Sequence, residues 1–202
     1  MRRIHALVLV PLIAFAACSA PAATTASPAA SAPASSAPAS SAPASSAPAT
    51  TAPAGDALTG DGYTLTLPEG WKDATADFKK LQPQVDTGAK KTTDIKDGFN
   101  DNVNVIAQTS GEVSFDSLRD AIKTQLEGAG STNIEFKETV RLDGRLAMQV
   151  WSNTKDAGDA HTIQFMTFNN GKLFVLTVST NLDDAAAAGL AQEFVSGWKW
   201  AA

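Results

Sequence analysis

Apolar and polar side chains alternate over several short segments between residues 63 and 180, a spacing typical of strands with one buried face. The segments are 63–68, 99–107, 134–142, 146–152, 162–168 and 173–180. Asp143-Gly144 joins the third to the fourth, and Asn170-Gly171 joins the fifth to the sixth. Both dipeptides favour two-residue turns with positive φ, so the pattern predicts two antiparallel hairpins.

The last of these segments is apolar on both of its faces. Leu173 and Val175 alternate with Phe174, Leu176 and Val178. A strand with two apolar faces needs cover on both sides, so segment 173–180 is predicted to be a central strand.

A spacing of three to four residues predicts helices over 75–82, 114–128 and 183–198. Ser114 and Asp183 are suited to cap the second and third of these helices. The polar interval 85–98 is predicted to be a loop. Helices that precede and follow a run of antiparallel strands indicate an α+β domain, with the helices packed on the faces of one sheet.

The chain starts with a predicted export signal, residues 1–17. Arg2 and Arg3 precede an apolar run that ends at Ala17 and is too short to span a bilayer as a helix. Phe15-Ala16-Ala17-Cys18 then resembles the lipobox of bacterial lipoproteins, with Phe15 at the position where Leu is usual. The resemblance implies that Cys18 becomes the N-terminus and carries acyl chains such as palmitate. The alternative is a secreted protein cut after Ala16, with Cys18 incidental.

Residues 18–55 consist almost entirely of Ala, Pro, Ser and Thr after the cysteine. Such a segment has too little apolar surface to offset the entropy of ordering, so it is predicted to be a disordered linker. Its prolines favour an extended chain with a reach of up to about 100 Å. The composition is typical both of an O-glycosylated stalk and of a bare spacer.

The remaining residues, 56–202, have the size of one domain and a strongly acidic composition. They contain all 21 acidic residues and every basic residue except Arg2 and Arg3, which gives a formal charge of −7. An acidic surface argues against nucleic acid and anionic lipid headgroups as partners.

Residues able to carry chemistry are few. His161 is the single histidine of residues 56–202. The sequence has no Gly-x-Ser-x-Gly elbow to pair with it and no set of zinc ligands around it. It is expected to be a surface residue. Four oxygen-bearing side chains gather in one predicted loop, but their spacing fails the calcium-loop pattern; they are Asp94, Asp97, Asn100 and Asp101. The sequence therefore predicts no catalytic residue, no metal site and no cofactor.

Trp151 has two interpretations. It lies on the face of its predicted strand opposite Met148 and Val150. Either a helix covers Trp151, or Trp151 lines a groove that takes an apolar ligand. We expect a helix to cover it, because sheets in layered folds are usually covered on both faces.

The order of these features resembles a known family. Tyr63 to Trp71 reads Tyr-x-Leu-x-Leu-Pro-x-Gly-Trp, and Phe99 to Val105 reads Phe-x-Asp-Asn-Val-Asn-Val; a helix, a strand meander and a last helix follow. This order is similar to that of the LpqN-type actinobacterial lipoproteins. The resemblance implies a Mog1/PsbP-like α/β/α sandwich around an antiparallel sheet, and it gives prominence to Asn102 and Asn104. Both are expected to bond backbone at a strand edge, with a ligand role as the alternative.

The expected function is that of a non-enzymatic lipoprotein anchored to the cell membrane on its extracytoplasmic face, in the cell envelope. Its domain is expected to bind a partner protein or an envelope ligand. One alternative is a carrier that holds an apolar ligand in a cavity between sheet and helix. The other is a hydrolase that uses two carboxylates, although the sequence does not single out a pair.

Overall fold

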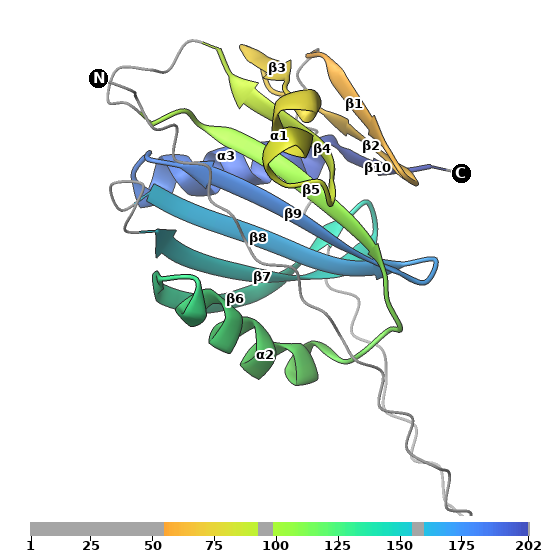
Figure 1. Cartoon of the computed structure of the whole chain (residues 1–202), viewed down its shortest axis with the longest axis vertical. Helices are drawn as coiled ribbons and strands as arrows, with labels where there is room; N and C mark the ends of the chain where they lie inside the picture. Colours follow the sequence, from red (N-terminus) through yellow and green to blue (C-terminus); the bar gives the residue numbers. More distant parts are fainter. Residues whose placement is uncertain (1–54, 93–98, 155–159, 202) are drawn as a thin grey trace, which may run out of the picture. The chain divides into compact units, whose positions relative to one another are not determined.

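Seven antiparallel strands form the main sheet of the computed structural model, which describes residues 55–92, 99–154 and 160–201. The order across the sheet is β3-β4-β5-β9-β8-β7-β6. The bounds are Trp71–Asp73 for β3, Val85–Lys91 for β4, Asn102–Thr109 for β5, Lys172–Thr180 for β9, Ala160–Asn169 for β8, Arg145–Thr154 for β7 and Ser131–Leu142 for β6. All neighbouring strands are antiparallel (Figure 1).

The two predicted hairpins are confirmed. Asp143 and Gly144 join β6 to β7 with φ of 44° and 88°, and Asn170 and Gly171 join β8 to β9 with φ of 48° and 71°. Asn, Asp and Gly tolerate this left-handed region better than other residues, which is why these dipeptides specify the turns.

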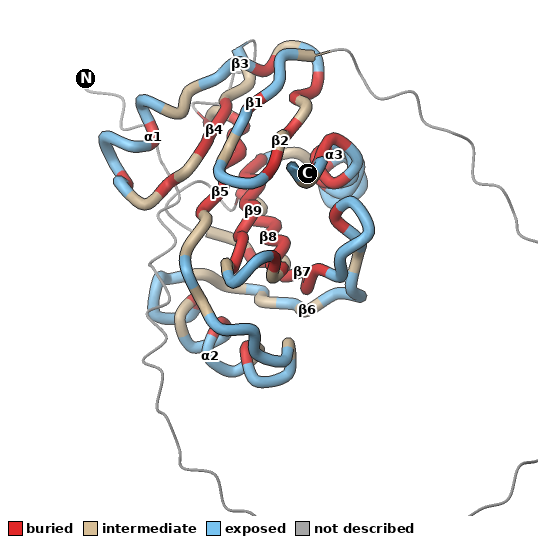
Figure 2. The backbone as a smooth tube through the Cα atoms, turned by 90° about the vertical axis from the view of Figure 1, so that its right-hand side faces the viewer, coloured by how far each residue is buried: buried red, intermediate tan, exposed pale blue. Residues whose placement is uncertain are grey.

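Strand β9 is central, as its two apolar faces predict. It pairs with β5 along one edge and with β8 along the other. From Leu173 to Thr180 every residue is buried. Figure 2 shows the reason: α1 (Thr75–Leu81) and α2 (Phe115–Gly128) lie on one side of the sheet, and α3 (Asp184–Gly197) lies on the other.

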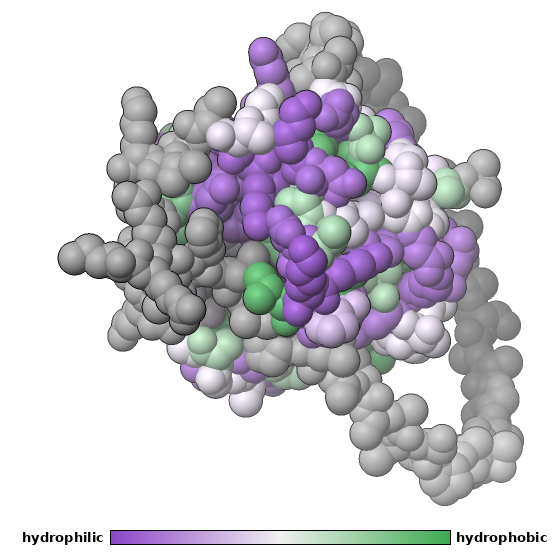
Figure 3. Space-filling model, turned by 45° about the horizontal axis from the view of Figure 1, so that its top comes forward, coloured by the Kyte–Doolittle hydropathy of each residue, from purple (hydrophilic) through white to green (hydrophobic). Residues whose placement is uncertain are grey.

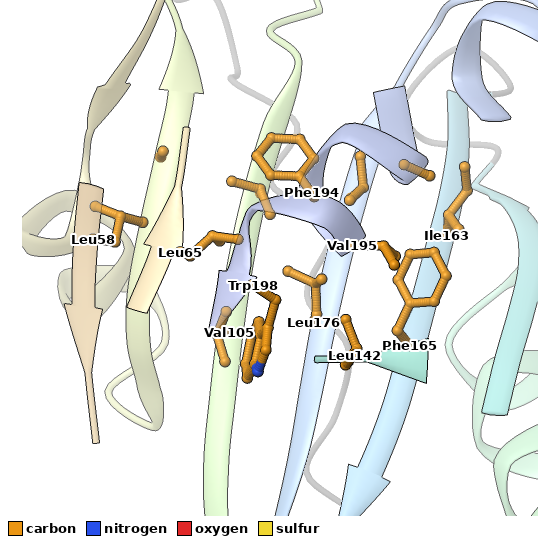
Figure 4. Packing of buried hydrophobic residues seen from close by; sticks show 14 of the residues in the cluster. Leu58, Leu65, Val105, Leu142, Ile163, Phe165, Leu176, Phe194, Val195 and Trp198 are labelled. Carbon is orange, nitrogen blue, oxygen red and sulfur yellow. The ribbon is translucent and has the colours of Figure 1, made fainter. Parts of the chain in front are cut away.

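The α3 side of the sheet holds the larger apolar cluster. A small second sheet, ordered β1-β2-β10, packs there beside α3; its strands are Ala57–Gly60, Tyr63–Thr66 and Trp198–Trp200. Phe194 and Trp198 are fully buried against residues such as Leu176 of β9 (Figure 4). The Tyr63 ring stacks on Trp198 at a centroid distance of 4.2 Å, and its hydroxyl bonds Thr87 Oγ1 at 2.7 Å. Burial raises the pKa of Tyr63, so the hydroxyl stays neutral.

On the opposite side, α2 places an apolar stripe on the sheet. Leu118, Ile122 and Leu126 are at most 2% exposed, and they share a cluster with Met148 and Met166 of the sheet. The side chain of Ser114 accepts a hydrogen bond from Ser117 N, which confirms the predicted cap.

The chain therefore has an α+β fold, with helices on both faces of an antiparallel sheet. The predicted signal, Cys18 and all but the last residue of the linker lie outside the described residues. Within the described ranges, no helix is long and apolar enough to cross a membrane.

The prediction of a loop over 85–98 was wrong for residues 85–91, which form β4. Val85, Thr87 and Ala89 are buried because β4 pairs with β5, and the register shifts between Val85 and Thr87. Val85, Thr87 and Ala89 do alternate with Asp86, Gly88 and Lys90, but Val85 is the only large apolar residue among them, so the pattern did not indicate a strand. The short strands β1, β3 and β10 were also missed, and β10 begins at Trp198, where the last helix was expected to continue.

The face formed by β1, β3 and α1 is mostly hydrophilic, with isolated apolar side chains (Figure 3).

The carboxylate of Asp143, in the β6–β7 turn, forms hydrogen bonds with the C-terminal strand β10. It accepts hydrogen bonds from Trp200 N at 3.0 Å and from Lys199 Nζ at 2.9 Å. The bond from Trp200 N, together with Lys199, lowers the pKa of Asp143 below its ordinary 3.8. A carboxyl group with a depressed folded-state pKa stabilises the fold above the unfolded value and loses that contribution as the pH falls through the folded one.

We expect Asp143→Asn to lower the free energy of unfolding by about 1 kcal/mol at neutral pH, because the charge-assisted bonds are lost from a partly exposed site. Asn is chosen because it tolerates the positive φ of this position. Urea unfolding across a pH series should show the difference from the wild type shrinking below pH 3.8, the ordinary pKa. Asp120→Asn, which changes an exposed carboxylate of α2, is the control. Parallel pH profiles for the wild type and Asp143→Asn would contradict this role.

Candidate functional site

Two rows of uncharged polar side chains cross the α1/α2 face of the main sheet, and we call them the polar rows. The first row runs across four strands through Asn102, Ser179, Thr162 and Ser152. The second runs across three strands through Asn104, Thr177 and Gln164. Residues directly opposite each other on antiparallel neighbours share a face, so the register alone brings these seven side chains together.

The next row along the same face is apolar. It consists of Ile106, Val175, Met166 and Met148, which belong to the cluster beneath α2. The polar rows therefore lie on the same buried face of the sheet as this apolar row, at positions where apolar side chains would be expected.

All seven residues of the polar rows are buried. Asn104 is 5% exposed, Asn102 and Ser152 are 3% exposed, and the remaining four are at most 1% exposed. Burying a polar group without a hydrogen-bonding partner is unfavourable, so each side chain needs a partner.

Some of the needed hydrogen bonds are present. Asn102 Nδ2 donates to Asn100 O at 3.0 Å. Gln164 Nε2 donates to Thr177 Oγ1 at 3.5 Å, which is long for a hydrogen bond. Thr162 Oγ1 lies 3.3 Å from Thr154 Oγ1.

Three buried atoms of the polar rows lack a hydrogen-bonding partner among the described residues: Ser152 Oγ, Gln164 Oε1 and Ser179 Oγ. They lie on the adjacent strands β7, β8 and β9. Leaving a buried donor or acceptor unsatisfied costs roughly 1–3 kcal/mol per group. Three such groups on adjacent strands make the polar rows a candidate binding site.

Helix α1 borders the polar rows on the β4 side. Gly88 and Lys90 of β4 pair with Asn104 and Asn102. A Cβ atom at Gly88 would lie 2.5 Å from Phe78 Cδ2, so Phe78 packs directly on the β4 backbone. Lys90 Nζ lies 5.4 Å from the centroid of the Phe78 ring and 3.8 Å from Asp77 Oδ2. The ammonium group of Lys90 thus contacts Phe78 and Asp77 and not the polar rows, whose own side chains are uncharged.

This arrangement is suited to hydrogen bonding with a ligand. The rows contain hydroxyl and amide groups, which donate and accept hydrogen bonds without changing charge near neutral pH. They contain no histidine, carboxylate or cysteine, the usual general bases and strong nucleophiles. The groups fit a neutral ligand that carries hydrogen-bonding atoms.

Asn102 and Asn104 are the sequence-predicted residues that the structure brings into this site. Asn102 bonds a backbone carbonyl, as expected. The expectation of a strand edge was wrong, because β5 lies between β4 and β9 in the interior of the sheet.

His161 and Trp151 lie on the opposite, α3-side face. His161 Nε2 is 3.3 Å from the exposed Asp184 Oδ1, and its side chain is partly buried, at 18% exposed. Trp151 is partly buried against the α3-side cluster, with Lys137 Nζ 5.7 Å from its ring centroid. Packing rather than a groove accounts for most of its surface.

The four oxygen-bearing side chains whose spacing failed the calcium-loop pattern are only partly described. Asp94 and Asp97 lie outside the described residues, and Asp101 is 1% exposed with Lys91 Nζ at 3.7 Å. In the described ranges, no group of three or more His, Cys, Asp or Glu side chains is placed to hold a metal ion.

Sequence reasoning missed Ser152, Thr162, Gln164 and Ser179. Polar residues that alternate with apolar ones were interpreted as the solvent-facing side of half-buried strands. The one available signal was that Thr177 and Ser179 stand on a strand already predicted to be central and covered on both sides.

Comparison by sequence finds no relative: no protein-family profile matches the chain, and no curated protein matches it either. Comparison of structures finds the solution structure of the cyanobacterial PsbP protein CyanoP from Synechocystis sp. PCC 6803. The TM-score is 0.51 at 20% identity, over 78% of this chain and 98% of CyanoP. This similarity shows the fold alone.

Two further solved structures are similar at lower scores. Mog1p, a Ran-binding protein of Saccharomyces cerevisiae, has a TM-score of 0.47 at 14% identity, over 69% of this chain and 90% of its own. LpqN of Mycobacterium tuberculosis, described as involved in cell envelope biogenesis, has a TM-score of 0.48 at 15% identity. The match covers 69% of this chain and 84% of LpqN.

We expect Ser179→Ala to raise the free energy of unfolding of the ligand-free protein by up to about 1 kcal/mol, because the unsatisfied hydroxyl is removed from the interior. Thr177→Val is the matched control on the same face of β9. It should lower stability, since it removes the acceptor of Gln164 Nε2. Urea unfolding measures both. A loss of more than about 1 kcal/mol in Ser179→Ala would show that Ser179 has a native partner in the protein itself.

Proposed function

We propose that the chain is a lipid-anchored, extracytoplasmic binding protein that holds a small neutral ligand on the polar rows and catalyses no reaction. The observation that supports this most is the trio of buried, unpartnered atoms Ser152 Oγ, Gln164 Oε1 and Ser179 Oγ. A ligand that supplies hydrogen bonds to these atoms would offset the cost of burying them without a partner in the protein.

The proposed location is supported by the N-terminal sequence. A basic start, a short apolar run and the lipobox-like Phe15-Ala16-Ala17-Cys18 follow the build of a lipoprotein signal. Two acyl chains on Cys18 would give stable anchoring. The Ala/Pro/Ser/Thr-rich linker would then let the domain work up to about 100 Å from the membrane.

The non-enzymatic part of the proposal is supported by the neutrality of the site. General acid–base catalysis relies on titratable groups. The polar rows supply hydroxyl and amide groups, with the neighbouring Lys90 held at Phe78 and Asp77. Such groups select a ligand by hydrogen bonding.

The alternative of an apolar carrier gains no support from the interface between the sheet and α2. Leu118, Ile122 and Leu126 fill this interface against Met148 and Val150, and all five side chains are at most 2% exposed. An acyl chain would need an apolar cavity of several hundred Å³ in this place.

Native mass spectrometry of the mature, full-length chain purified from the membranes of its own host tests the binding function. We expect a small molecule that leaves only on denaturation. Gln164→Leu combined with Ser179→Ala should lose it, because both changes remove hydrogen-bonding atoms from the site. Ser196→Ala, on the exposed surface of α3, is the control and should retain it. A wild-type chain with the same mass before and after denaturation would overturn the proposal.

Cys18→Ser tests the anchor. We expect the wild type to take up labelled palmitate and to sediment with membranes, and the variant to lose both properties because the lipidated thiol is gone. Native-like unfolding of both proteins in urea would show that the domain itself is unchanged. An unlabelled wild type released into the medium would show an ordinary secreted protein.

A further inference from the structure

The unpartnered serine hydroxyls of the polar rows indicate how large a ligand of these rows has to be. Ser179 pairs with Thr162, and Thr162 pairs with Ser152, so the two serines stand two strands apart on β9 and β7. Neighbouring strands are about 4.8 Å apart, which separates the two serines by about 10 Å. A water molecule or an ion bonds atoms that lie within about 3 Å of it. Neither can therefore reach both hydroxyl groups.

Gln164 supplies a third point, on the strand between the two serines and one row away. It follows Thr162 by two residues on β8, which displaces it by about 7 Å along the strand. Its Nε2 donates to Thr177 Oγ1, so the atom without a partner among the described residues is the acceptor Oε1. The three positions thus form a triangle of about 10 Å by 7 Å, an area that one or two sugar rings can bridge.

The chemistry of the three atoms specifies the groups that a ligand has to offer. Gln164 Oε1 needs a donor, whereas the hydroxyls of Ser152 and Ser179 both donate and accept. Ligand hydroxyl groups meet all of these needs, because each of them also donates and accepts. Val150 pairs with Gln164 on the same face of the sheet and offers an apolar contact to the C–H groups of a ring. A ring that carries several hydroxyl groups therefore matches the site.

A charged ligand is not matched by the polar rows. Their seven side chains are uncharged amides and hydroxyls, and the ammonium group of the neighbouring Lys90 contacts Phe78 and Asp77. Phosphates and carboxylates are bound most strongly by charged donors, and ammonium groups by carboxylates. The rows offer neither kind of partner.

Two neutral classes of ligand are matched less well than a sugar. An extended peptide binds a sheet by adding a strand to a free edge, but β8 and β9 are paired on both edges. A nucleobase binds by stacking on aromatic side chains, and the polar rows contain none. Recognition here depends on side-chain hydrogen bonds alone.

We propose that the ligand of the polar rows is a neutral sugar of one or two rings, which forms hydrogen bonds with Ser152, Gln164 and Ser179 at the same time. This inference rests on the binding function proposed above and adds the chemical class of the ligand. A free sugar and the sugar headgroup of a lipid present the same hydroxyl groups, so both sources share this chemistry.

Tandem mass spectrometry tests the chemical class. The sample is the molecule that the mature, full-length chain, purified from the membranes of its own host, releases on denaturation. We expect fragments that differ by the mass of a neutral sugar residue, and cleavage by periodate, which oxidises neighbouring hydroxyl groups. An acyl chain on the same molecule would identify a lipid headgroup as the source, and a molecule without one would identify a free sugar.

Ser152→Ala and Ser179→Ala provide the matched test, because they remove hydrogen bonds at opposite ends of a ligand that spans both positions. Each variant, purified from the same host, should lose the bound sugar about tenfold faster than the wild type when the complexes are diluted and their masses are followed over time. Thr124→Ala, on the exposed surface of α2, is the control and should keep the wild-type rate. Urea unfolding checks that each variant retains the fold.

The possible outcomes separate this inference from the binding function itself. A released molecule without a sugar ring, or a charged sugar, would overturn the proposed class and leave the binding function standing. A neutral sugar whose release neither serine variant accelerates would belong to another site and would overturn both. A chain that releases no molecule would overturn the binding function and this inference with it.

Discussion

Strand β9 is the element on which the rest of the domain depends, because its backbone is paired on both edges and its side chains are buried on both faces. Its α3-side residues Phe174, Leu176 and Val178 are apolar and anchor the larger cluster. On its other face, Thr177 and Ser179 replace the apolar pattern that Leu173 and Val175 begin. A strand so enclosed cannot solvate its polar side chains.

The proposed ligand site follows from how helices cover one face of the sheet. Helix α2 packs on the apolar row that contains Met148 and Met166. Along the strands in one direction the polar rows begin, and in the other Leu146 is left 49% exposed.

Much of the fold could be predicted from local sequence signals, since Asp143-Gly144 and Asn170-Gly171 specify their turns by positive φ. Ser114 specifies the start of α2 by capping. Strand β4 could not be predicted, because Val85 is its only large apolar residue and its small side chains are buried through pairing with β5. The polar rows could not be predicted either, because the sequence does not show which strands are covered. Gln164 on a solvent-facing strand and Gln164 in a covered one look alike until the covering element is known.

The most direct test of the central claim is a crystal structure of the mature chain purified from its own membranes, at a resolution that shows ordered water. The account predicts density for a molecule larger than water, within hydrogen-bonding distance of Ser152 Oγ, Gln164 Oε1 and Ser179 Oγ. Separate water molecules that bond each of these atoms to the protein would contradict it. The polar rows would then be a hydrated part of the interior.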